Sequence, residues 1–465
     1  MVDRTRLPAI GPDPELQFPR AEKRHLANGL RLWSVERRDL PVVCLLLMWP
    51  VGVAADPDTQ PGLAAFTADL LDEGSGNRTG FQLHEELARL GAELDIEVTP
   101  DAIYITLTTL EHHLDAGLSL LADLVTDPRF DEADVARVRA LRLGRLRQLR
   151  DIPGAVADRT LTARLYGSHP YGHTALGTEQ SLSTISTDDL RGFHRNYLLR
   201  IPPLLIAVGD IHQSTLAERV TRAWTDRHAW TMAPAVAEPD RGLSVPQTSG
   251  WRLAVIDRPG AAQSELRVAR VALPRATPDY YTLNVLNVIL GGSFVSRINL
   301  NLRAEKGYTY GARSSFEFRR LPGPFTVQAS VQTNATVESV SEILREIREI
   351  QGPRPATAGE LSRAHAALVR GYPRGFETVQ QIADAWSQVA LFELPDDAFE
   401  RFMPSIRAVT GADVSAAARR HLPPGDFHIV VVGDADRIRL GLSRLGLGEP
   451  MEVPVSADSE VSSWQ

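Results

Sequence analysis

The sequence predicts an α+β protein made of two homologous halves, each an α/β sandwich in which helices cover an antiparallel-rich sheet. The first observation behind this prediction is length, because 465 residues exceed what one ordinary hydrophobic core accommodates. The second is an internal repeat. The third is a mixture of strand pairs with hairpin patterns and amphipathic helical runs, which is typical of helices packed on an antiparallel sheet.

The repeat is clearest at two apolar segments that end in the same way. Residues 204–210 are LLIAVGD and residues 428–434 are HIVVVGD, so Asp210 and Asp434 lie 434 − 210 = 224 residues apart. Upstream, ISTDDLRGFHRNYL at 185–198 matches VTGADVSAAARRHL at 409–422 with the same offset. A period of this length predicts a duplicated domain, because the units of a solenoid are far shorter.

The domain boundaries follow from this repeat and from composition. Residues 229–250 are rich in Pro, Ala, Gly and Ser and have little periodicity, which is typical of a linker. The sequence therefore predicts an N-terminal extension at 1–20, a first domain at 21–228, a linker at 229–250, a second domain at 251–447 and a C-terminal tail at 448–465.

Within the first half, local patterns predict the individual elements in order. The apolar runs at 31–35 and 42–48 predict strands. Thr79, with Gln82 three residues later, predicts the capping box of a helix that ends at Gly91. The other expected elements are a helix that begins near Pro61, a hairpin of residues 93–98 and 102–108, helices at 113–125, 133–149 and 188–197, and a strand at 204–208.

Composition restricts the function classes. The net charge of −8 gives no reason to expect nucleic-acid binding. The longest apolar run, residues 41–50, is too short to span a membrane, and the single cysteine, Cys44, lies inside it and is expected in the core. The N-terminus has no apolar signal-peptide region, which predicts a cytoplasmic protein as given, or a periplasmic one if a leader has been removed.

The most informative segment is PGLAAFTADLLDEG at residues 61–74. Leu63, Phe66 and Leu70 recur at i, i+3 and i+7 and indicate an amphipathic helix that ends at Gly74. This frame resembles the zinc helix of the pitrilysin/insulinase-type (inverzincin) metallopeptidases. Further segments resemble the same family: NGL at 28–30, HPYGHTALGTEQ at 169–180, both VGD endings and LGGSFVSRINLNLRAEKGYTYG at 290–311. The resemblance implies a fold like that of mitochondrial processing peptidase.

The zinc-binding residues of that family are missing. Its helix carries H-x-x-E-H, in which two histidines bind Zn²⁺ and the glutamate activates water. The matching positions here are Ala65, Ala68 and Asp69, and a methyl group has no lone pair to donate to a metal. A third ligand, a glutamate on a later helix, would fall near 144–146, where the arginine-rich run 135–150 has no carboxylate. We therefore expect no zinc in this chain and no peptidase activity of the chain alone.

A second part of the family pattern is retained. Gly291 and Gly292 predict a turn, Ser293 an N-cap, and the stripe Phe294, Ile298 and Leu302 a helix that runs to about Glu305. Gly307 then ends the helix, and residues 308–318 alternate like a strand.

Arg303 on the last helical turn and Tyr310 on the strand match an Arg/Tyr pair that binds the substrate backbone in active family members. Two donors that need no deprotonation suit a peptide carbonyl. The alternative is that Arg303 only favours the helix C-terminus and Tyr310 packs at a sheet edge. The arginine-rich run likewise has two interpretations, a solvated helix face or a surface for an acidic partner.

The resemblance implies a non-catalytic, substrate-binding subunit of a heterodimeric zinc metallopeptidase. Arg303 and Tyr310 would complete the active site of a homologous partner that carries H-x-x-E-H, holds the zinc and cleaves the peptide substrate. The alternatives are a structural subunit, with the pair as a relic, and a subunit that encloses peptides without a role in proteolysis.

Overall fold

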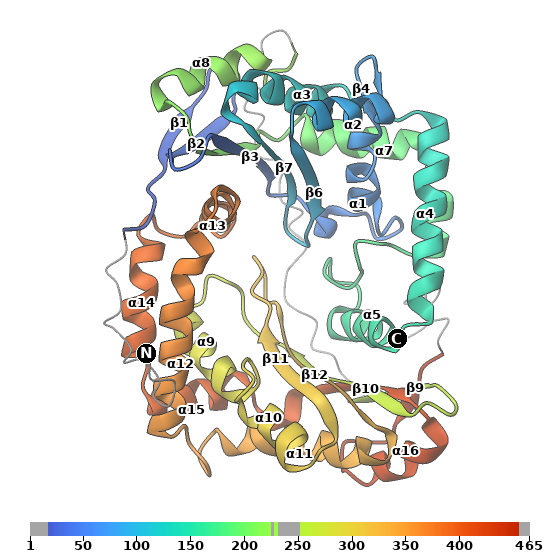
Figure 1. The fold of residues 1–465 in the computed structure, drawn as a ribbon. Coiled ribbons are helices and arrows are strands. Elements are labelled where there is room, and N and C mark those ends of the chain that lie inside the picture. The colour runs from blue at the N-terminus through green and yellow to red at the C-terminus, as the bar shows by residue number, and fades with distance from the viewer. Residues whose placement is uncertain (1–16, 225–226, 231–251, 455–465) are drawn as a thin grey trace, which may run out of the picture.

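The computed structural model of the protein describes residues 17–224, 227–230 and 252–454. It contains two six-stranded sheets, one from each half of the chain, which lie one above the other in Figure 1. Helices cover the outer face of each sheet, and most strand pairs are antiparallel. The predicted α+β class with two similar halves is confirmed.

The first sheet contains the strands predicted from local patterns. The parallel pair β2–β8 lies beside antiparallel neighbours on both sides. In spatial order its strands are β1 (Glu22–His25), β2 (Arg31–Glu36), β8 (Leu204–Gly209), β3 (Val42–Trp49), β7 (Ile103–Leu110) and β6 (Glu93–Val98).

The second sheet has the same order, which is the structural form of the sequence repeat. β9 and β13 are parallel like β2 and β8, and β13 begins at His428, which is 428 − 204 = 224 residues after Leu204. In matching order its strands are β14 (Met451–Glu452), β9 (Leu253–Asp257), β13 (His428–Gly433), β10 (Gln263–Val271), β12 (Pro324–Gln332) and β11 (Thr309–Phe316).

The ends of the predicted domains differ from the structure in three places. β14 lies in the predicted tail but pairs with β9, so the second sheet extends past residue 447. Trp230 lies in the predicted linker, yet it is buried in the first core; the rest of that linker, from residue 231, is outside the described residues. Phe18, in the predicted extension, packs against the rings of Phe376 and Tyr372.

The helices of the first half lie where the sequence predicts most of them. Thr79 and Gln82 form the expected capping box, and the helix predicted over 61–74 is shorter than expected. A small β-ribbon, β4 (Gly74–Ser75) with β5 (Arg78–Thr79), follows it. The helices are α1 (Leu63–Ala68), α2 (Gly80–Arg89), α3 (Leu114–Thr126), α4 (Glu132–Arg150), α6 (Glu179–Thr184), α7 (Thr187–Phe193) and α8 (Gln213–Trp224).

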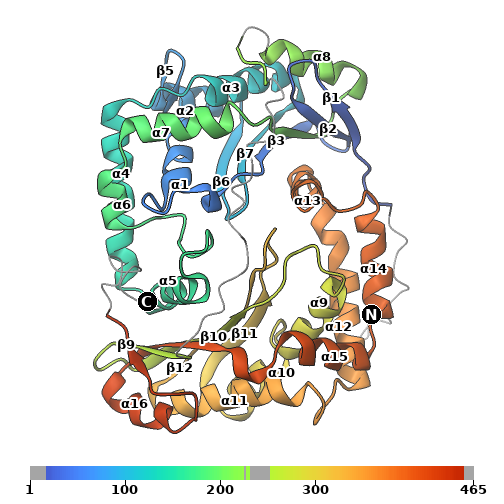
Figure 2. The same cartoon turned by 180° about the vertical axis from the view of Figure 1, so that it is seen from behind.

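In the second half, helices likewise pack on the outer face of the sheet. Seen from behind, its helices lie below and beside the second sheet (Figure 2). They are α9 (Tyr280–Leu290), α10 (Arg297–Asn299), α11 (Thr336–Glu349), α12 (Ala358–Gly371), α14 (Ala398–Ala408), α15 (Gly411–His421) and α16 (Ala435–Ser443).

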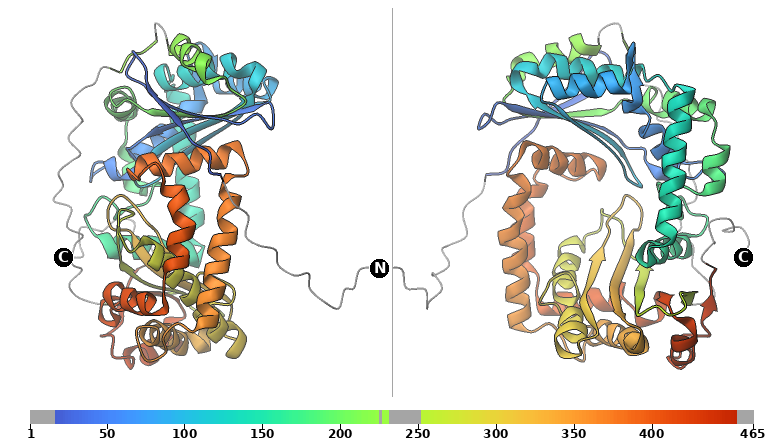
Figure 3. Two further views of the ribbon diagram at one scale, coloured as in Figure 1. Left: turned by 90° about the vertical axis from the view of Figure 1, so that its left-hand side faces the viewer. Right: turned by 45° about the vertical axis from the view of Figure 1, so that its right-hand side comes forward.

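Each half also gives one helix to the sheet of the other half. α5 (Pro153–Tyr166) packs on the inner face of the second sheet, and α13 (Val379–Leu391) packs on the inner face of the first. Figure 3 shows α4 along one side of the molecule and α12 with α14 along the other. In the chain, α4 precedes α5, and α13 lies between α12 and α14. The sequence analysis did not predict this exchange.

The exchange is possible because central strands such as β3 and β13 are apolar on both faces. Successive side chains of a strand point to opposite faces, and in β3 Leu45 and Leu47 enter the first core while Cys44, Leu46 and Met48 meet α13. In the second sheet the face turned toward α5 is lined by Ala254, Ile256, Val430 and Val432.

The contact between α13 and the first sheet contains a perturbed carboxyl group. Partial burial of Asp384 on α13 raises its pKa to about 6, and the negative charges of Glu97 and Asp95 on β6 add to this shift. Because the pKa in the folded state exceeds the ordinary value of 3.8, the folded protein binds this proton more tightly than the unfolded chain does.

We predict that Asp384→Asn raises the thermal midpoint at pH 8 and has little effect near pH 4. The ionised carboxylate disfavours the fold above its folded pKa, so the wild type loses stability as pH rises from 3.8 through about 6. Thermal unfolding of both proteins at the two pH values measures this. Asp95→Asn is the companion variant and should reduce the pH dependence; an equal gain from Asp384→Asn at both pH values would contradict the prediction.

Candidate functional site

The helix that resembles a zinc helix is fixed at its N-terminus by a buried carboxylate. Asp56 is 1% exposed, and its oxygens accept hydrogen bonds from the backbone N–H groups of Gly62 (2.6 Å) and Ala64 (2.7 Å). His173 Nε2 lies 3.1 Å from the same carboxylate. One carboxylate thus satisfies two N–H groups that a helix start leaves free, and the histidine from the HPYGHTALGTEQ segment holds it in place.

This segment packs tightly on the start of α1. Gly62 has φ +93°, and a Cβ atom on it would lie 2.8 Å from the Cα atom of Gly177, so no larger residue fits without displacement. Ser181 Oγ donates to the backbone oxygen of Pro61 (2.7 Å). Residues 169–181 therefore pack against the start of α1.

The three positions that match the zinc motif carry no metal-binding set. Ala65 and Ala68 are buried methyl groups, 6% and 1% exposed, and the Asp69 carboxylate is ion-paired with Arg142 of α4. The side chain of Arg142 is 7% exposed, and it also donates to the backbone oxygen of Ala175 (2.5 Å). A guanidinium held at this carboxylate repels a cation, so these residues do not fit Zn²⁺.

The rest of the described chain also lacks a set of metal ligands. No group of three or more His, Cys, Asp or Glu side chains among residues 17–224, 227–230 and 252–454 is arranged to hold a metal ion. Most arginines of the α4 run are engaged within the chain, among them Arg137 with Glu73 and Arg150 with Glu179. The run therefore connects α4 to its neighbours and is not simply a solvated helix face.

We predict that Asp69→Ala lowers the unfolding free energy by about 1–3 kcal/mol, because it leaves the Arg142 guanidinium buried without its counter-charge. Chemical denaturation measures this value. The double variant Asp69→Ala/Arg142→Leu should recover much of the loss, since it removes the stranded charge. A cost below about 0.5 kcal/mol for Asp69→Ala, the range of ordinary surface substitutions, would show that the pair does not stabilise this region.

The segment that carries Arg303 is less regular than the sequence predicts. Ser293 does not cap a helix: α10 starts after Ser296, and the chain then continues as a π-helical segment, Leu300–Glu305. Phe294 precedes the helix and is 67% exposed, so the predicted apolar stripe is wrong at this position, whereas Ile298 and Leu302 are buried. The wider π turn occurs often at functional sites, and here it carries Arg303.

Tyr310 lies in an irregularity of β11. The pairing with β12 shifts between Thr309 and Ala312, which adds one residue on the β11 side, as in a β-bulge. Thr309 Oγ1 fixes the bulge, because it donates to the backbone oxygen of Ser330 (2.6 Å) and accepts from the N–H of Gly311 (3.0 Å). A bulge redirects the side chain at its site, and Tyr310 is 92% exposed.

Arg303 and Tyr310 thus both face solvent at adjoining irregular segments. The Arg303 guanidinium carbon lies 4.3 Å from the centroid of the Phe294 ring, a cation–π contact. Neither polar group has a hydrogen-bond partner within the described residues. Exposed apolar side chains cluster in the same stretch of the chain: Phe294, Val295 and Leu300.

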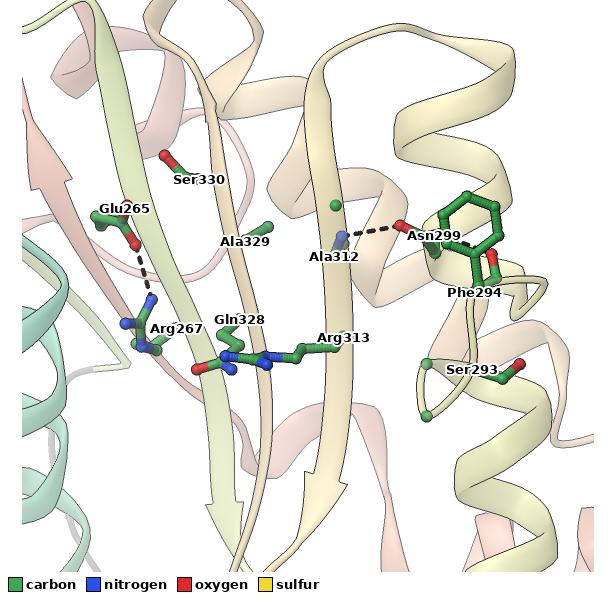
Figure 4. A pocket seen from close by; sticks show the side chains of 13 residues that line it. Glu265, Arg267, Ser293, Phe294, Asn299, Ala312, Arg313, Gln328, Ala329 and Ser330 are labelled. Atoms are coloured by element: carbon green, nitrogen blue, oxygen red, sulfur yellow. Dashed lines mark hydrogen bonds and ion pairs between the residues drawn. The ribbon is translucent and has the colours of Figure 1, made fainter. Parts of the chain in front are cut away.

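A pocket of about 520 Å³ lies beside this stretch on the inner face of the second sheet (Figure 4). Three strands and the α9–α10 connection form it. Its lining residues are Glu265, Arg267, Gly291, Gly292, Ser293, Phe294, Asn299, Gly311, Ala312, Arg313, Gln328, Ala329 and Ser330. Phe294 belongs to both the pocket and the Arg303 contact, so the two features are continuous.

β11 is the edge strand of the second sheet, and two of its outward-facing backbone N–H groups already have hydrogen-bond partners. The N–H of Ala312 donates to Asn299 Oδ1 (3.0 Å), and the N–H of Ser314 donates to the backbone oxygen of Gly291 (3.0 Å). These are N–H groups that an added peptide strand would need. The pocket is therefore suited to side chains and not to addition of a strand at this edge.

Fold and site define the class: a duplicated α+β protein of the zinc-peptidase type whose metal positions are filled by other side chains. The comparisons agree. Residues 36–179 match the family described as Insulinase (Peptidase family M16), and residues 184–368 match the Peptidase M16 inactive domain; together they cover more than two thirds of the chain. The chain belongs to the M16 family.

Three relatives illustrate the range within this family. The chain is 23% identical over 319 residues to an uncharacterized zinc protease of Bacillus subtilis, YmxG, covering 69% of this chain and 75% of that one. It is 22% identical over 404 residues to a Helicobacter pylori protein named non-peptidase homolog YmxG, covering 86% and 90%. A crystal structure of a peptidase M16 inactive domain from Pseudomonas fluorescens superposes with a TM-score of 0.79 at 25% identity, covering 89% and 98%.

Proposed function

We propose that this chain is the non-catalytic, substrate-binding subunit of a heterodimeric zinc metallopeptidase. The observation that supports it is an asymmetry between the two halves. In the first half, the zinc-motif positions hold two buried methyl groups and an ion-paired carboxylate. In the second, Arg303 and Tyr310 are exposed beside a pocket, and neither has a hydrogen-bond partner within the described residues. A relative named as a non-peptidase homologue fits this assignment.

In this proposal the two side chains act on a peptide carbonyl near the scissile bond. A guanidinium and a phenol donate hydrogen bonds without first losing a proton, and they stabilise the negative charge that develops on the carbonyl oxygen. Zinc and the attacking water belong to a homologous partner with the H-x-x-E-H helix. The exposed apolar residues Phe294 and Val295 supply contact surface for the substrate or for that partner.

We predict that Arg303→Ala or Tyr310→Phe in this chain lowers peptide cleavage by the complex by about 10²-fold, the usual effect of removing one oxyanion-type donor. Arg303→Lys should also be impaired, because an ammonium lacks the planar fork of donors. Zinc content, complex formation and thermal stability should stay unchanged, since both side chains are exposed. Steady-state kcat/KM of the complex with each variant is the measurement.

Arg348→Gln on α11, on the opposite face of the second sheet, is the matched control and should leave kcat/KM unchanged. If both site variants stay within about twofold of wild type, well under 1 kcal/mol, the Arg/Tyr pair has no role in proteolysis. The function would then be that of a structural or peptide-binding subunit.

The partner is tested separately by co-expression with an H-x-x-E-H homologue of the same genome and by sizing of the product. We expect a 1:1 complex with a large interface. The chain alone should hold no stoichiometric zinc and hydrolyse no peptide. A chain that pairs only with itself, or that holds one tightly bound Zn²⁺ per molecule, would contradict the heterodimer.

A further inference from the structure

The pocket beside Arg303 contains a row of polar side chains across three strands. The pairing of β10 with β12 places Arg267 opposite Gln328, and the pairing of β12 with β11 places Gln328 opposite Arg313. Figure 4 shows Arg313 extended from β11 across β12 toward Gln328 and Arg267. Arg267, Gln328 and Arg313 thus form one row across the inner face of the sheet.

The charge of the first guanidinium is balanced within the chain. Arg267 is 5% exposed, and its Nε donates to Asp158 of α5 (2.5 Å) while its Nη1 lies 3.1 Å from Glu265. It also donates to the backbone oxygens of Leu266 and Gly154. Arg267 therefore connects α5 to the second sheet, and its charge is not available to a ligand.

Arg313 differs, because it is exposed and has no ion pair within the described residues. With the Gln328 amide turned so that its oxygen faces Arg313, that oxygen accepts hydrogen bonds from Nε and from Nη2, the latter at 2.9 Å. The amide holds the guanidinium over the sheet without neutralising it. The remaining N–H donors of Arg313 are left for a ligand.

The rest of the lining is small or apolar and limits what enters. Gly291, Gly292 and Gly311 present no side chain to the pocket, and the exposed ring of Phe294 borders it. The acidic residue of the lining, Glu265, is paired with Arg267. Arg313 is therefore the guanidinium of the lining that no carboxylate engages within the described residues, and its planar, paired donors suit a carboxylate.

We propose that this pocket is a subsite for a carboxylate of a bound peptide and that Arg313 is its specificity-determining residue. The carboxylate belongs to an acidic side chain or to the C-terminus of the peptide. The proposal rests on the proposed function in one respect, that peptides bind across Arg303 and Tyr310. It deepens that function by assigning an acidic class of substrate to the same site.

The test measures peptide binding by the purified full-length chain at low ionic strength. The probes are fluorescent octapeptides with both ends blocked, in which a single Glu or a single Gln occupies each position in turn. A third set carries Gln and a free C-terminal carboxylate, so that the two sources of the carboxylate are distinguished. Fluorescence anisotropy gives the dissociation constants.

We expect one Glu position, or the free C-terminus, to bind about tenfold more tightly than its neutral counterpart, as for a hydrogen bond to a charged group. Arg313→Gln should remove this preference and leave the affinity for the neutral peptide unchanged. Arg348→Gln, which removes the same charge on the far face of the sheet, should keep it. The preference should also weaken as salt is raised.

Three results would overturn the subsite. They are equal affinity of charged and neutral peptides at every position, absence of binding, and a preference that persists in Arg313→Gln. Arg303→Ala and Tyr310→Phe separate this result from the proposed function. If the Arg/Tyr pair binds the backbone, these variants weaken charged and neutral peptides alike. If they have no effect while Arg313→Gln removes the preference, the carboxylate subsite holds and the role of the pair fails.

Discussion

The exchange of α5 and α13 between the halves is the constraint on which the rest of the structure depends. The central strands of each sheet are apolar on both faces, and a helix of the other half covers the inner face of each. Trp386 of α13 is 2% exposed and meets Trp33 of the first sheet at a ring distance of 5.7 Å. Each half thus buries an apolar face of the other.

This arrangement fixes where chemistry can take place. The first half holds α1 and α4 together through the ion pair of Asp69 and Arg142, at the positions where its relatives with H-x-x-E-H would carry metal ligands. The pair joins the end of α1 to α4, and it supplies no nucleophile or Lewis acid. The second half leaves its irregular segment open, so Arg303 and Tyr310 remain accessible. The proposed division of labour between two homologous subunits would account for both observations.

The pocket and the Arg/Tyr pair differ in how they are built. Arg303 and Tyr310 depend on local departures from regular structure, a π-helical segment and a shift in strand pairing. The polar row of Arg267, Gln328 and Arg313 depends on the register of three regular strands. α5 reaches this row through Asp158, so the helix exchange that covers the sheet also gives Arg267 an ion pair, whereas Arg313 has none within the part of the chain that the structure describes.

The sequence by itself determined the duplication, the α+β class, strands such as β3 and β6, and the Thr79 capping box, because these depend on periodicity and on contacts between near neighbours. It also determined that Ala65 and Ala68 offer no metal ligand. Only the tertiary structure showed that Ser293 does not cap a helix and that Arg142 pairs with Asp69. It also showed that α5 and α13 each pack on the sheet of the other half. The sequence also did not predict the row of Arg267, Gln328 and Arg313. Strand register and packing between distant segments set these features, and no local pattern encodes them.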